Sequence, residues 1–287
     1  MKTLVIYSNV DGFAVQLKNH LEDALDELQI EWKECHITDV AKVNEEFQPT
    51  MNIFYHPNKS IYDYIETIKN LKGHKLYWTH EDPYESDMTF DMAKYFYYIF
   101  TSDENTAEAL KKEFPNNSIH YVPHACNPRV HRKVEVPYEY RSDMCFVGNA
   151  YESRIKWIQQ HTEDIRDKMF TLIGVGYRGV SDLSSQRVIH GHISEPEMVK
   201  YINGAKTVLN LHRINTDLDM ANSRKITPKH LNNRFYEVSA IGKSQIIEGR
   251  DNMKDEIDEV IKMKPEEYSY TSRLKEYYLP LLKGVGK

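Results

Sequence analysis

Three features of the sequence predict an α/β protein made of two domains with parallel sheets. Short apolar runs alternate with amphipathic segments up to residue 125, the alternation stops in a polar stretch, and it resumes near residue 142. Apolar strands separated by helices are typical of parallel sheets that are covered on both faces. The chain has 287 residues, which exceeds the usual length of one domain, about 100 to 200 residues. We therefore expect two Rossmann-like domains.

The first half of the chain alternates strands and helices in order. Strands are predicted at residues 3–8, 51–56, 75–80, 98–103 and 119–125. Helices are predicted between them at residues 13–28, 60–71, 91–98 and 105–114. Ser102 or Asp103 can cap the last of these helices, because a side-chain oxygen there can accept a hydrogen bond from the first turn. This series predicts an N-terminal Rossmann-like domain over residues 1–124.

The second half repeats the pattern after a linker. Residues 125–141 are polar, contain prolines and show no clear periodicity, which predicts the linker. Beyond it, strands are predicted at residues 144–149, 169–176, 187–193, 206–213 and 244–249. Helices are predicted at residues 152–161, 195–204 and 229–242, and Ser194 with Glu197 forms a capping-box pattern at the start of the second. We expect a C-terminal Rossmann-like domain at 142–270 and a terminal amphipathic helix at 271–287.

Composition and charge narrow the possible ligands and the compartment. The formal net charge of −6 and the pI near 6.1 give no overall basic field, so a small phosphate-bearing molecule is an easier ligand than a nucleic acid. The cysteines, Cys35, Cys126 and Cys145, lack metal-ligand spacing. The N-terminus has no signal-peptide layout, and no apolar run reaches about 18 residues. These observations predict a reduced, cytoplasmic protein without a membrane span.

The strand end at "CFVGNAYESR" is the first candidate for a phosphate site. Gly148 and Asn149 directly follow a predicted strand, and Arg154 lies in the helix after it. Backbone N–H groups and a guanidinium could meet one phosphate group there. The alternative is structural: Gly148 permits a tight turn, and Arg154 is a solvated helix charge.

The segment "LNNRFYEVSAIG" is the second candidate. Arg234 and Glu237 share a face of a predicted helix, and Asn232 and Asn233 stand near its start. The guanidinium suits diphosphate oxygens, and the carboxylate suits ribose hydroxyls. A surface ion pair is the alternative, although the apolar residues around the pair favour a helix deep in the domain.

Histidines and an arginine end two further strands of the second half. His192 could contact the base or a phosphate of a nucleotide, and Arg213 could add positive charge. His190 is better interpreted as a hydrogen-bonded core histidine, because a histidine on an apolar strand is more often buried than a ligand.

In the first half, "THEDPYES" gathers ionisable groups after a predicted strand. His80, Glu81 and Asp82 are candidates for the base that takes a proton from an attacking hydroxyl. Asp82 before Pro83 could instead begin a turn. Tyr84 and His124 are weaker candidates for contact with the acceptor.

Six blocks of the chain resemble, in order, the pattern of the CgeB-like (spore maturation protein) glycosyltransferases, which have the GT-B fold. The blocks are "YWTHEDPYE", "YIFTSD", "IHYVPHACNPRVH", "DMCFVGNAYESRIKWI", "GHISEPEMVKYINGAKTVLNLHR" and "NNRFYEVSAIGKSQI". The resemblance implies nucleotide-sugar-dependent glycosyl transfer in a cleft between two domains, without a bound metal. It also implies that Arg154 and Arg234 contact the diphosphate and that Glu237 contacts the ribose.

One position departs from that pattern. Many retaining GT-B enzymes carry a first glutamate two helical turns before the second, and the corresponding residue of this chain is Lys229. The stereochemical outcome is therefore open. Lys229 could add charge near the phosphates or be a solvated lysine at a helix start.

We therefore expect a glycosyltransferase that moves a sugar from a nucleoside-diphosphate sugar to a hydroxyl acceptor, with no further cofactor and no metal. UDP-glucose is the default donor because UDP-sugars are frequent in this fold. A glycan, a protein, a metabolite and a modified DNA base all stay open as acceptors. A non-catalytic nucleotide-sugar-binding module is the alternative from another class. An epimerase or a phosphorylase of similar shape is the alternative among enzymes.

Overall fold

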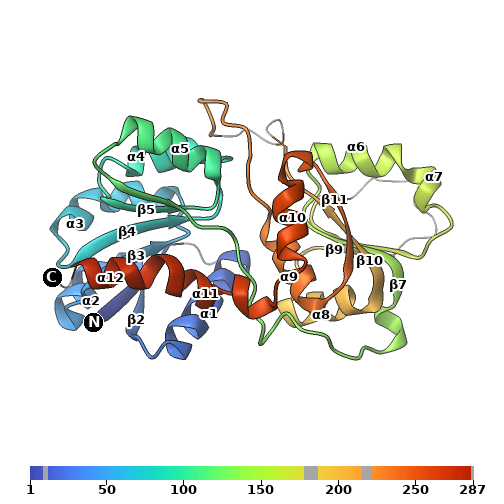
Figure 1. The fold of residues 1–287 in the computed structure, drawn as a ribbon, viewed down its shortest axis with the longest axis horizontal. Helices are drawn as coiled ribbons and strands as arrows, with labels where there is room; N and C mark the ends of the chain where they lie inside the picture. Colours follow the sequence, from blue (N-terminus) through green and yellow to red (C-terminus); the bar gives the residue numbers. More distant parts are fainter. Residues whose placement is uncertain (9–11, 178–186, 215–216, 218–220, 286–287) are drawn as a thin grey trace. The chain divides into compact units, whose positions relative to one another are not determined.

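The computed structural model describes residues 1–8, 12–177, 187–214, 217 and 221–285 (Figure 1). The chain divides into two compact units. Unit 1 comprises Met1–His124, Ala221–His230 and Tyr270–Lys287, and unit 2 comprises Ala125–Met220 and Leu231–Ser269. No helix in the described part of the chain is long and apolar enough to cross a membrane.

Unit 1 is built on a parallel sheet that has six strands within the described residues. The strand order is β2-β1-β3-β4-β5-β6. The strands are β1 (Lys2–Tyr7), β2 (Glu31–His36), β3 (Met51–Tyr55), β4 (His74–Thr79), β5 (Tyr98–Thr101) and β6 (Ser118–Tyr121). The order reverses between β1 and β3, and ligands of such sheets bind beyond the carboxyl ends of the strands near the reversal.

Helices cover this sheet, and some of them come from the far end of the chain. The helices between the strands are α1 (Gly12–Glu27), α2 (Val40–Phe47), α3 (Ile65–Asn70), α4 (Ser86–Met92) and α5 (Glu104–Glu113). The terminal helices α11 (Tyr270–Arg273) and α12 (Leu279–Val285) lie beside the N-terminal strands (Figure 1). The hydroxyls of Thr3 in β1 and Tyr278 are hydrogen-bonded at 2.6 Å. The terminal segment therefore packs on unit 1.

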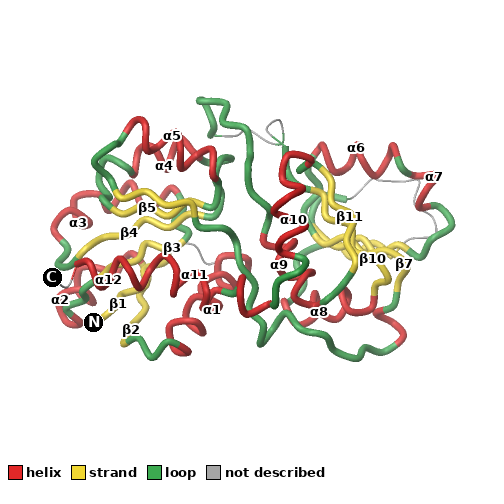
Figure 2. Tube along the Cα trace, viewed as in Figure 1, coloured by secondary structure: helices red, strands yellow, loops and turns green. Residues whose placement is uncertain are grey.

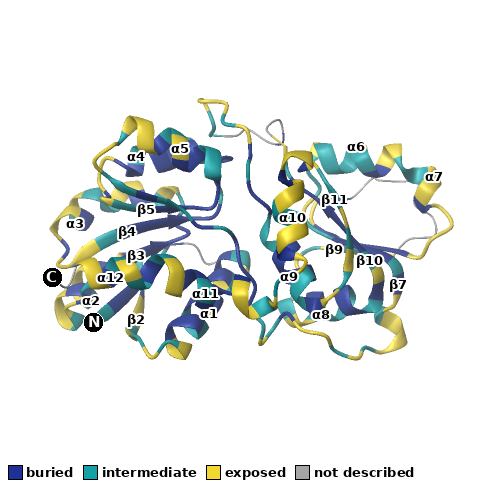
Figure 3. Ribbon diagram, in the orientation of Figure 1, coloured by how far each residue is buried: buried dark blue, intermediate teal, exposed yellow. Residues whose placement is uncertain are grey.

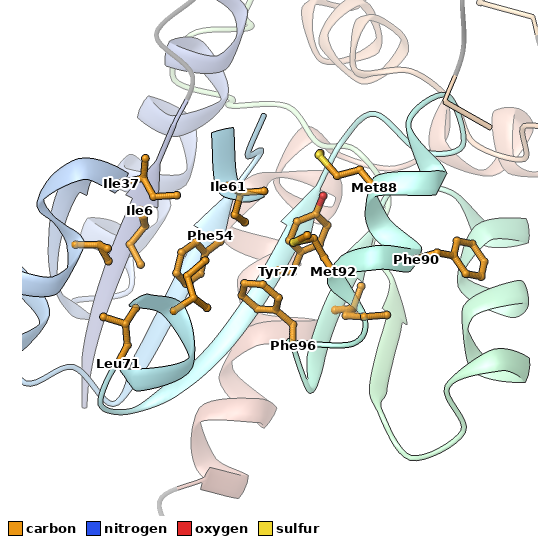
Figure 4. Packing of buried hydrophobic residues seen from close by; sticks show 14 of the residues in the cluster. Ile6, Ile37, Phe54, Ile61, Leu71, Tyr77, Met88, Phe90, Met92 and Phe96 are labelled. Atoms are coloured by element: carbon orange, nitrogen blue, oxygen red, sulfur yellow. The ribbon is translucent and has the colours of Figure 1, made fainter. Parts of the chain in front are cut away.

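The core of unit 1 lies between the sheet and helices α2 to α5. Figure 4 shows Phe54, Tyr77 and Phe96 in this core; the Phe54 and Phe96 rings pack edge to face with their centroids 5.1 Å apart, and the Tyr77 ring is tilted against Phe96. The middle strand β3 is wholly buried and β4 is buried over Leu76–Thr79, whereas much of β2 is exposed (Figure 3). This burial explains why the sequence of β3 is mostly apolar, and its one polar residue, Asn52, is hydrogen-bonded to Asn44 and to backbone carbonyls.

Unit 2 is built on a second parallel sheet with helices on its faces (Figure 2). Among the described residues its strand order is β11-β10-β7-β8-β9. The strands are β7 (Ser142–Val147), β8 (Phe170–Gly174), β9 (Arg187–His190), β10 (Ala205–Leu211) and β11 (Ser244–Glu248). The helices are α6 (Glu152–Gln160), α7 (Thr162–Ile165), α8 (Glu195–Gly204), α9 (Asn233–Ile241) and α10 (Lys254–Val260). The strand order reverses between β7 and β10, which marks the expected ligand edge.

The two parallel α/β sheets confirm the predicted pair of Rossmann-like domains, and the elements differ from prediction in several places. The edge strand β2 and helix α2 were not predicted, because β2 has few apolar residues and faces solvent along most of its length. Helix α4 covers Ser86–Met92 instead of 91–98, and the chain turns before Phe96 enters the core. Helix α9 begins at Asn233, with Asn232 as its N-cap, rather than at 229.

The predicted helix caps are present. Asp103, rather than Ser102, caps α5 by accepting a hydrogen bond from the Thr106 N–H. Ser194 caps α8 by accepting from the Glu197 N–H. The division into units also differs from the sequence-based boundaries, since residues 221–230 return to unit 1 and the 125–141 segment is part of unit 2.

Candidate functional site

Gly148 is the first residue of the ligand edge of unit 2. It directly follows β7, and its N–H donates to the Ile173 carbonyl at 2.9 Å. A Cβ atom at this position would lie 3.1 Å from Nη1 of Arg154 and 3.0 Å from the Phe146 ring. Because its N–H is already engaged by β8, the contribution of Gly148 is the space that lets the guanidinium reach the strand end.

Arg154 ties together the ends of β7 and β10. Its Nε donates to the Leu211 carbonyl at 3.0 Å, and its Nη1 donates to the Asn149 carbonyl at 3.0 Å. Burial lowers the pKa of the Arg154 guanidinium from its ordinary value, but arginine stays protonated in proteins. The strand ends therefore hold a fixed positive charge between them.

Arg213 adds a second positive charge at this edge. The ring of Tyr151 lies 4.6 Å from the Arg154 guanidinium and 4.7 Å from that of Arg213. Two cations on one aromatic ring repel each other in the absence of an anion, so the arrangement suits a ligand that carries negative charge.

Helix α9 supplies the second group of polar residues. The Asn232 side chain accepts from the Phe235 N–H at 2.9 Å and donates to Asn210 of β10 at 2.8 Å. The Asn232 N–H donates to Nε2 of His212 at 3.2 Å, and Nδ1 of the same ring contacts the Glu248 carbonyl at 3.2 Å. These contacts fix the start of α9 at the carboxyl end of β10.

Asn233, Arg234 and Glu237 converge on this first part of α9. The buried Glu237 carboxylate accepts from the Asn233 amide at 2.8 Å and is paired with Nη1 of Arg234. The same guanidinium nitrogen contacts the sulfur of Met198. Nε of Arg234 is buried without a hydrogen-bond partner. This is unusual for a buried donor, and it leaves Nε available to an acceptor atom of a ligand.

The predicted donor residues form two groups that approach the edge from opposite faces of the sheet. Arg154 lies over Phe146, which packs with α6 on one face. Arg234 contacts Met198, which packs with Cys145 on the other. Successive side chains of a strand point to opposite faces, which accounts for the separation of Cys145 from Phe146.

His192 is not brought into either group. It is exposed and follows β9, and β8 separates β9 from β7 in the sheet. Neighbouring strands are about 4.8 Å apart, so β9 and β7 are separated by about 10 Å. Sequence spacing could not reveal this, because it does not give the order of strands in a sheet.

In unit 1, Asp82 is a fully buried residue of the 80–82 segment. Its carboxylate accepts from the hydroxyls of Thr89 at 2.8 Å and Thr101 at 2.6 Å. Burial raises its pKa to about 7. The bond to Pro83 is cis. Both oxygens are thus used to hold α4 and β5 against the segment, which favours the structural interpretation of Asp82.

His80 belongs to a cluster of histidines, which we call the histidine cluster and which consists of His56, His80, His124 and His230. The ring centroid of His80 lies 5.8 Å from that of His56 and 5.5 Å from that of His124. The ring centroid of His124 lies 5.8 Å from that of His230. All four are buried. Burial lowers the pKa values of His80 and His124 well below the ordinary value. Glu81, next to His80, is half-buried.

Two members of this cluster, His56 and His230, were missed by the sequence analysis. His56 follows β3 just as His80 follows β4, so the same strand-end signal could have revealed it. His230 could not be found in this way, because it comes from the segment that returns to unit 1 between β10 and α9.

Lys229 lies in that returning segment too. Its ammonium group is paired with Glu104 at 2.8 Å, and its N–H donates to Asp103 at 2.6 Å. It therefore neutralises a carboxylate of α5 in unit 1 rather than contributing to α9.

The chain has two Rossmann-like units, and arginines lie at the carboxyl edge of the second sheet. This is the architecture of GT-B proteins. Residues 154–274 match a family described as glycosyl transferase-like. The chain is 24% identical over 249 residues to spore protein CgeB of Bacillus subtilis (strain 168), covering 84% of this chain and 77% of that protein. These matches confirm the predicted resemblance to the CgeB-like glycosyltransferases of the GT-B type.

Solved structures share the whole fold at low identity. An alpha-glucosyltransferase in complex with UDP and a 13-mer DNA superposes with a TM-score of 0.62 at 11% identity, over 100% of both chains. AviGT4, a glycosyltransferase involved in avilamycin A biosynthesis, gives 0.64 at 10% identity, over 99% of this chain and 98% of that one. A UDP-GlcNAc 2-epimerase from Methanocaldococcus jannaschii gives 0.57 at 12% identity, over 98% and 99%.

Proposed function

We propose that the protein transfers a sugar from a nucleoside-diphosphate sugar to a hydroxyl acceptor, with UDP-glucose as the default donor. The observation that carries the proposal is the pair of arginines on Tyr151, at the point where the strand order of unit 2 reverses. A nucleoside diphosphate is the ligand class that places two adjacent negative charges there. The UDP bound by the similar alpha-glucosyltransferase supports UDP as the nucleotide.

The proposed donor contacts follow from the two groups. Arg154 and Arg213 bind diphosphate oxygens; Gly148 leaves room for the Arg154 guanidinium at the strand end, and the Asn149 carbonyl holds it there. Arg234 adds a further contact to the phosphates when its guanidinium turns from Glu237, whose carboxylate then accepts from ribose hydroxyls. Asn233 holds Glu237 in place. His192 contributes only if the ligand extends toward β9.

The proposed acceptor contacts come from unit 1. His80 and Glu81 contact the acceptor beside its attacking hydroxyl, and Asp82 positions them by holding the segment through Thr89 and Thr101. We propose that arginines, rather than a metal ion, neutralise the leaving diphosphate and that no further cofactor takes part. A cytoplasmic location agrees with the three free cysteines.

A thermal-shift panel of UDP, GDP, ADP, dTDP and their glucose conjugates tests the proposed function. A ligand that binds only the folded state raises the midpoint of unfolding. We expect UDP and UDP-glucose to stabilise the wild type and not Arg234→Ala. Arg166→Ala is the matched control, because Arg166 is an exposed arginine of unit 2. Absence of a shift with every nucleotide would refute the proposal.

The two rival functions give different results in turnover assays. The similarity in fold to a UDP-GlcNAc 2-epimerase supports an epimerase as one rival. An epimerase would epimerise UDP-GlcNAc without an acceptor. A non-catalytic module would be stabilised by the donor and release no UDP with any acceptor.

A further inference from the structure

The strand ends of unit 1 that carry the histidine cluster contain buried polar atoms that have no hydrogen-bond partner. Among the described residues these atoms include Nδ1 of His80, Nδ1 of His124 and Oγ of Ser102. Each buried polar group without a hydrogen-bond partner destabilises the folded state. Native structures rarely keep several such atoms in one place unless a ligand or water completes them.

The cluster lies where this fold places ligands. His56 follows β3, His80 follows β4, Ser102 and Asp103 follow β5, and His124 follows β6. They therefore share the carboxyl edge of one sheet, close to the reversal between β1 and β3. His56 also has a φ of +46°, a left-handed backbone that side chains rarely adopt outside functional sites and turns.

His230 and Asp103 form an oriented pair at the end of this row. Nδ1 of His230 lies 3.1 Å from Oδ2 of Asp103. The carboxylate also accepts from the N–H groups of Lys229 at 2.6 Å and Thr106 at 2.8 Å. Burial raises the pKa of Asp103, but its hydrogen bond with His230 and the backbone N–H groups outweigh this and hold it below the ordinary value. An ionised Asp103 selects the tautomer with the proton on Nδ1, which makes Nε2 the proton acceptor.

The chemistry of the cluster fits an uncharged polyhydroxyl ligand. A neutral imidazole offers one donor and one acceptor, as a hydroxyl group does. An anionic acceptor such as DNA would instead need cations, and His80 and His124 are kept neutral by burial and by the histidines around them. The cation beside His124 is Arg273, which already donates to the His124 carbonyl and is paired with Glu276.

We propose that the histidine cluster is the acceptor site, in which His80 and His124 bind hydroxyls of an uncharged carbohydrate and the Asp103-oriented His230 removes the proton of the attacking hydroxyl. This rests on the proposed function. The acceptor O–H bond breaks, and its proton goes to Nε2 of His230. The acceptor oxygen forms a bond to the anomeric carbon of the donor, whose bond to the diphosphate oxygen breaks. The nucleoside diphosphate leaves with that electron pair. Asp103 is a positioning residue that stabilises the imidazolium.

Binding is tested by NMR on the full chain labelled with ¹⁵N-histidine. Glucose, maltotriose and glycerol are the uncharged probes, and glucose 6-phosphate and a single-stranded DNA oligonucleotide are the charged ones. We expect the uncharged sugars to shift ring signals that disappear in His80→Gln and His124→Gln. Shifts with the oligonucleotide alone, or none with any sugar, would overturn the proposal.

Catalysis is tested by sugar-stimulated release of UDP from UDP-glucose. We expect His230→Gln to lower this rate by about 10²–10⁴-fold, the range of general base catalysis, while UDP still stabilises the folded protein. His74→Gln is the matched control, since His74 is an exposed histidine at the other end of β4. Asp103→Asn should abolish the fixed Nδ1–H signature of His230 in the NMR spectrum. A His230→Gln rate within twofold of wild type would refute the catalytic assignment.

The two hypotheses fail in different ways. If neither UDP nor UDP-glucose binds the wild type, the proposed function fails, and the NMR titration with sugars still decides whether the cluster binds carbohydrate. If the donor binds but no sugar shifts the histidine signals, only the inference about the acceptor site fails.

Discussion

The carboxyl edges of the two sheets differ in charge and in burial. The edge of unit 2 carries Arg154 and Arg213 beside an aromatic ring. The edge of unit 1 carries His80 and His124, whose pKa values are lowered by burial, and a buried aspartate, Asp82, whose pKa is raised to about 7. The same strand–helix repeat has thus produced one edge suited to anions and one suited to uncharged polar groups. The residues after each strand, rather than the fold, set this difference.

The largest expected effect concerns the buried aspartate of unit 1. Because burial raises the pKa of Asp82 to about 7, the folded state binds its proton more tightly than the unfolded state does. The protonated carboxyl therefore stabilises the folded state fully below pH 4. This stabilisation, up to about 4 kcal/mol in the free energy of unfolding, is lost as the pH rises to about 7. Asp82→Asn should remove this loss. Urea unfolding of both proteins at pH 4.5 and 8 measures the difference, and parallel pH dependences would contradict the prediction.

The second prediction concerns the charged edge of unit 2. Arg154→Ala removes a charge-assisted contact worth about 1.5–3 kcal/mol, so the affinity for UDP should fall about tenfold to a hundredfold. Calorimetric titration with UDP measures it, beside Arg166→Ala as an exposed control. An unchanged affinity would remove Arg154 from the proposed donor site and weaken the contrast between the edges.

The third prediction concerns the neutral histidines. Burial, followed by His230, His56 and Arg273, lowers the pKa of His124 well below its ordinary value. The stability contribution of the neutral ring is present above pH 6.5 and is lost as the pH falls toward the folded-state pKa. As the pH falls from 7.5 to 5, the wild type should lose more stability than His124→Gln. Thermal unfolding at pH 5 and 7.5 tests this, and equal losses in both proteins would show that His124 titrates normally.

The smallest effect is expected at the segment 221–230, which holds His230 in unit 1. Arg224 lies 3.1 Å from Glu113 and 3.6 Å from Asp87, and its guanidinium stands over the Phe90 ring. These contacts are partly exposed, so Arg224→Ala should cost only about 0.5–1.5 kcal/mol. Urea unfolding measures the loss. A cost of several kcal/mol would show that the returning segment contributes far more to unit 1 than its contacts indicate.

Much of the fold could be predicted from the sequence because its strands are buried. The strands β3, β4 and β10 are mostly apolar at their buried positions, since both faces of a parallel sheet are covered. The edge strand β2 lacks that signal. In the candidate site, the proximity of Asn233, Arg234 and Glu237 follows from helical spacing. The contact between Arg154 and the end of β10, and the place of His192, depend on strand order, which local sequence does not encode.

The path of the chain between the units limits how the protein can be dissected. Unit 1 is assembled from three separate stretches of sequence and unit 2 from two. A fragment of residues 1–124 would lack Ile226, which packs against the core, and Tyr278, the hydrogen-bond partner of Thr3. It would also lack His230, and Asp103 would lose a partner. Halves produced by cleavage after residue 124 should therefore regain a complete unit 1 only when they are mixed.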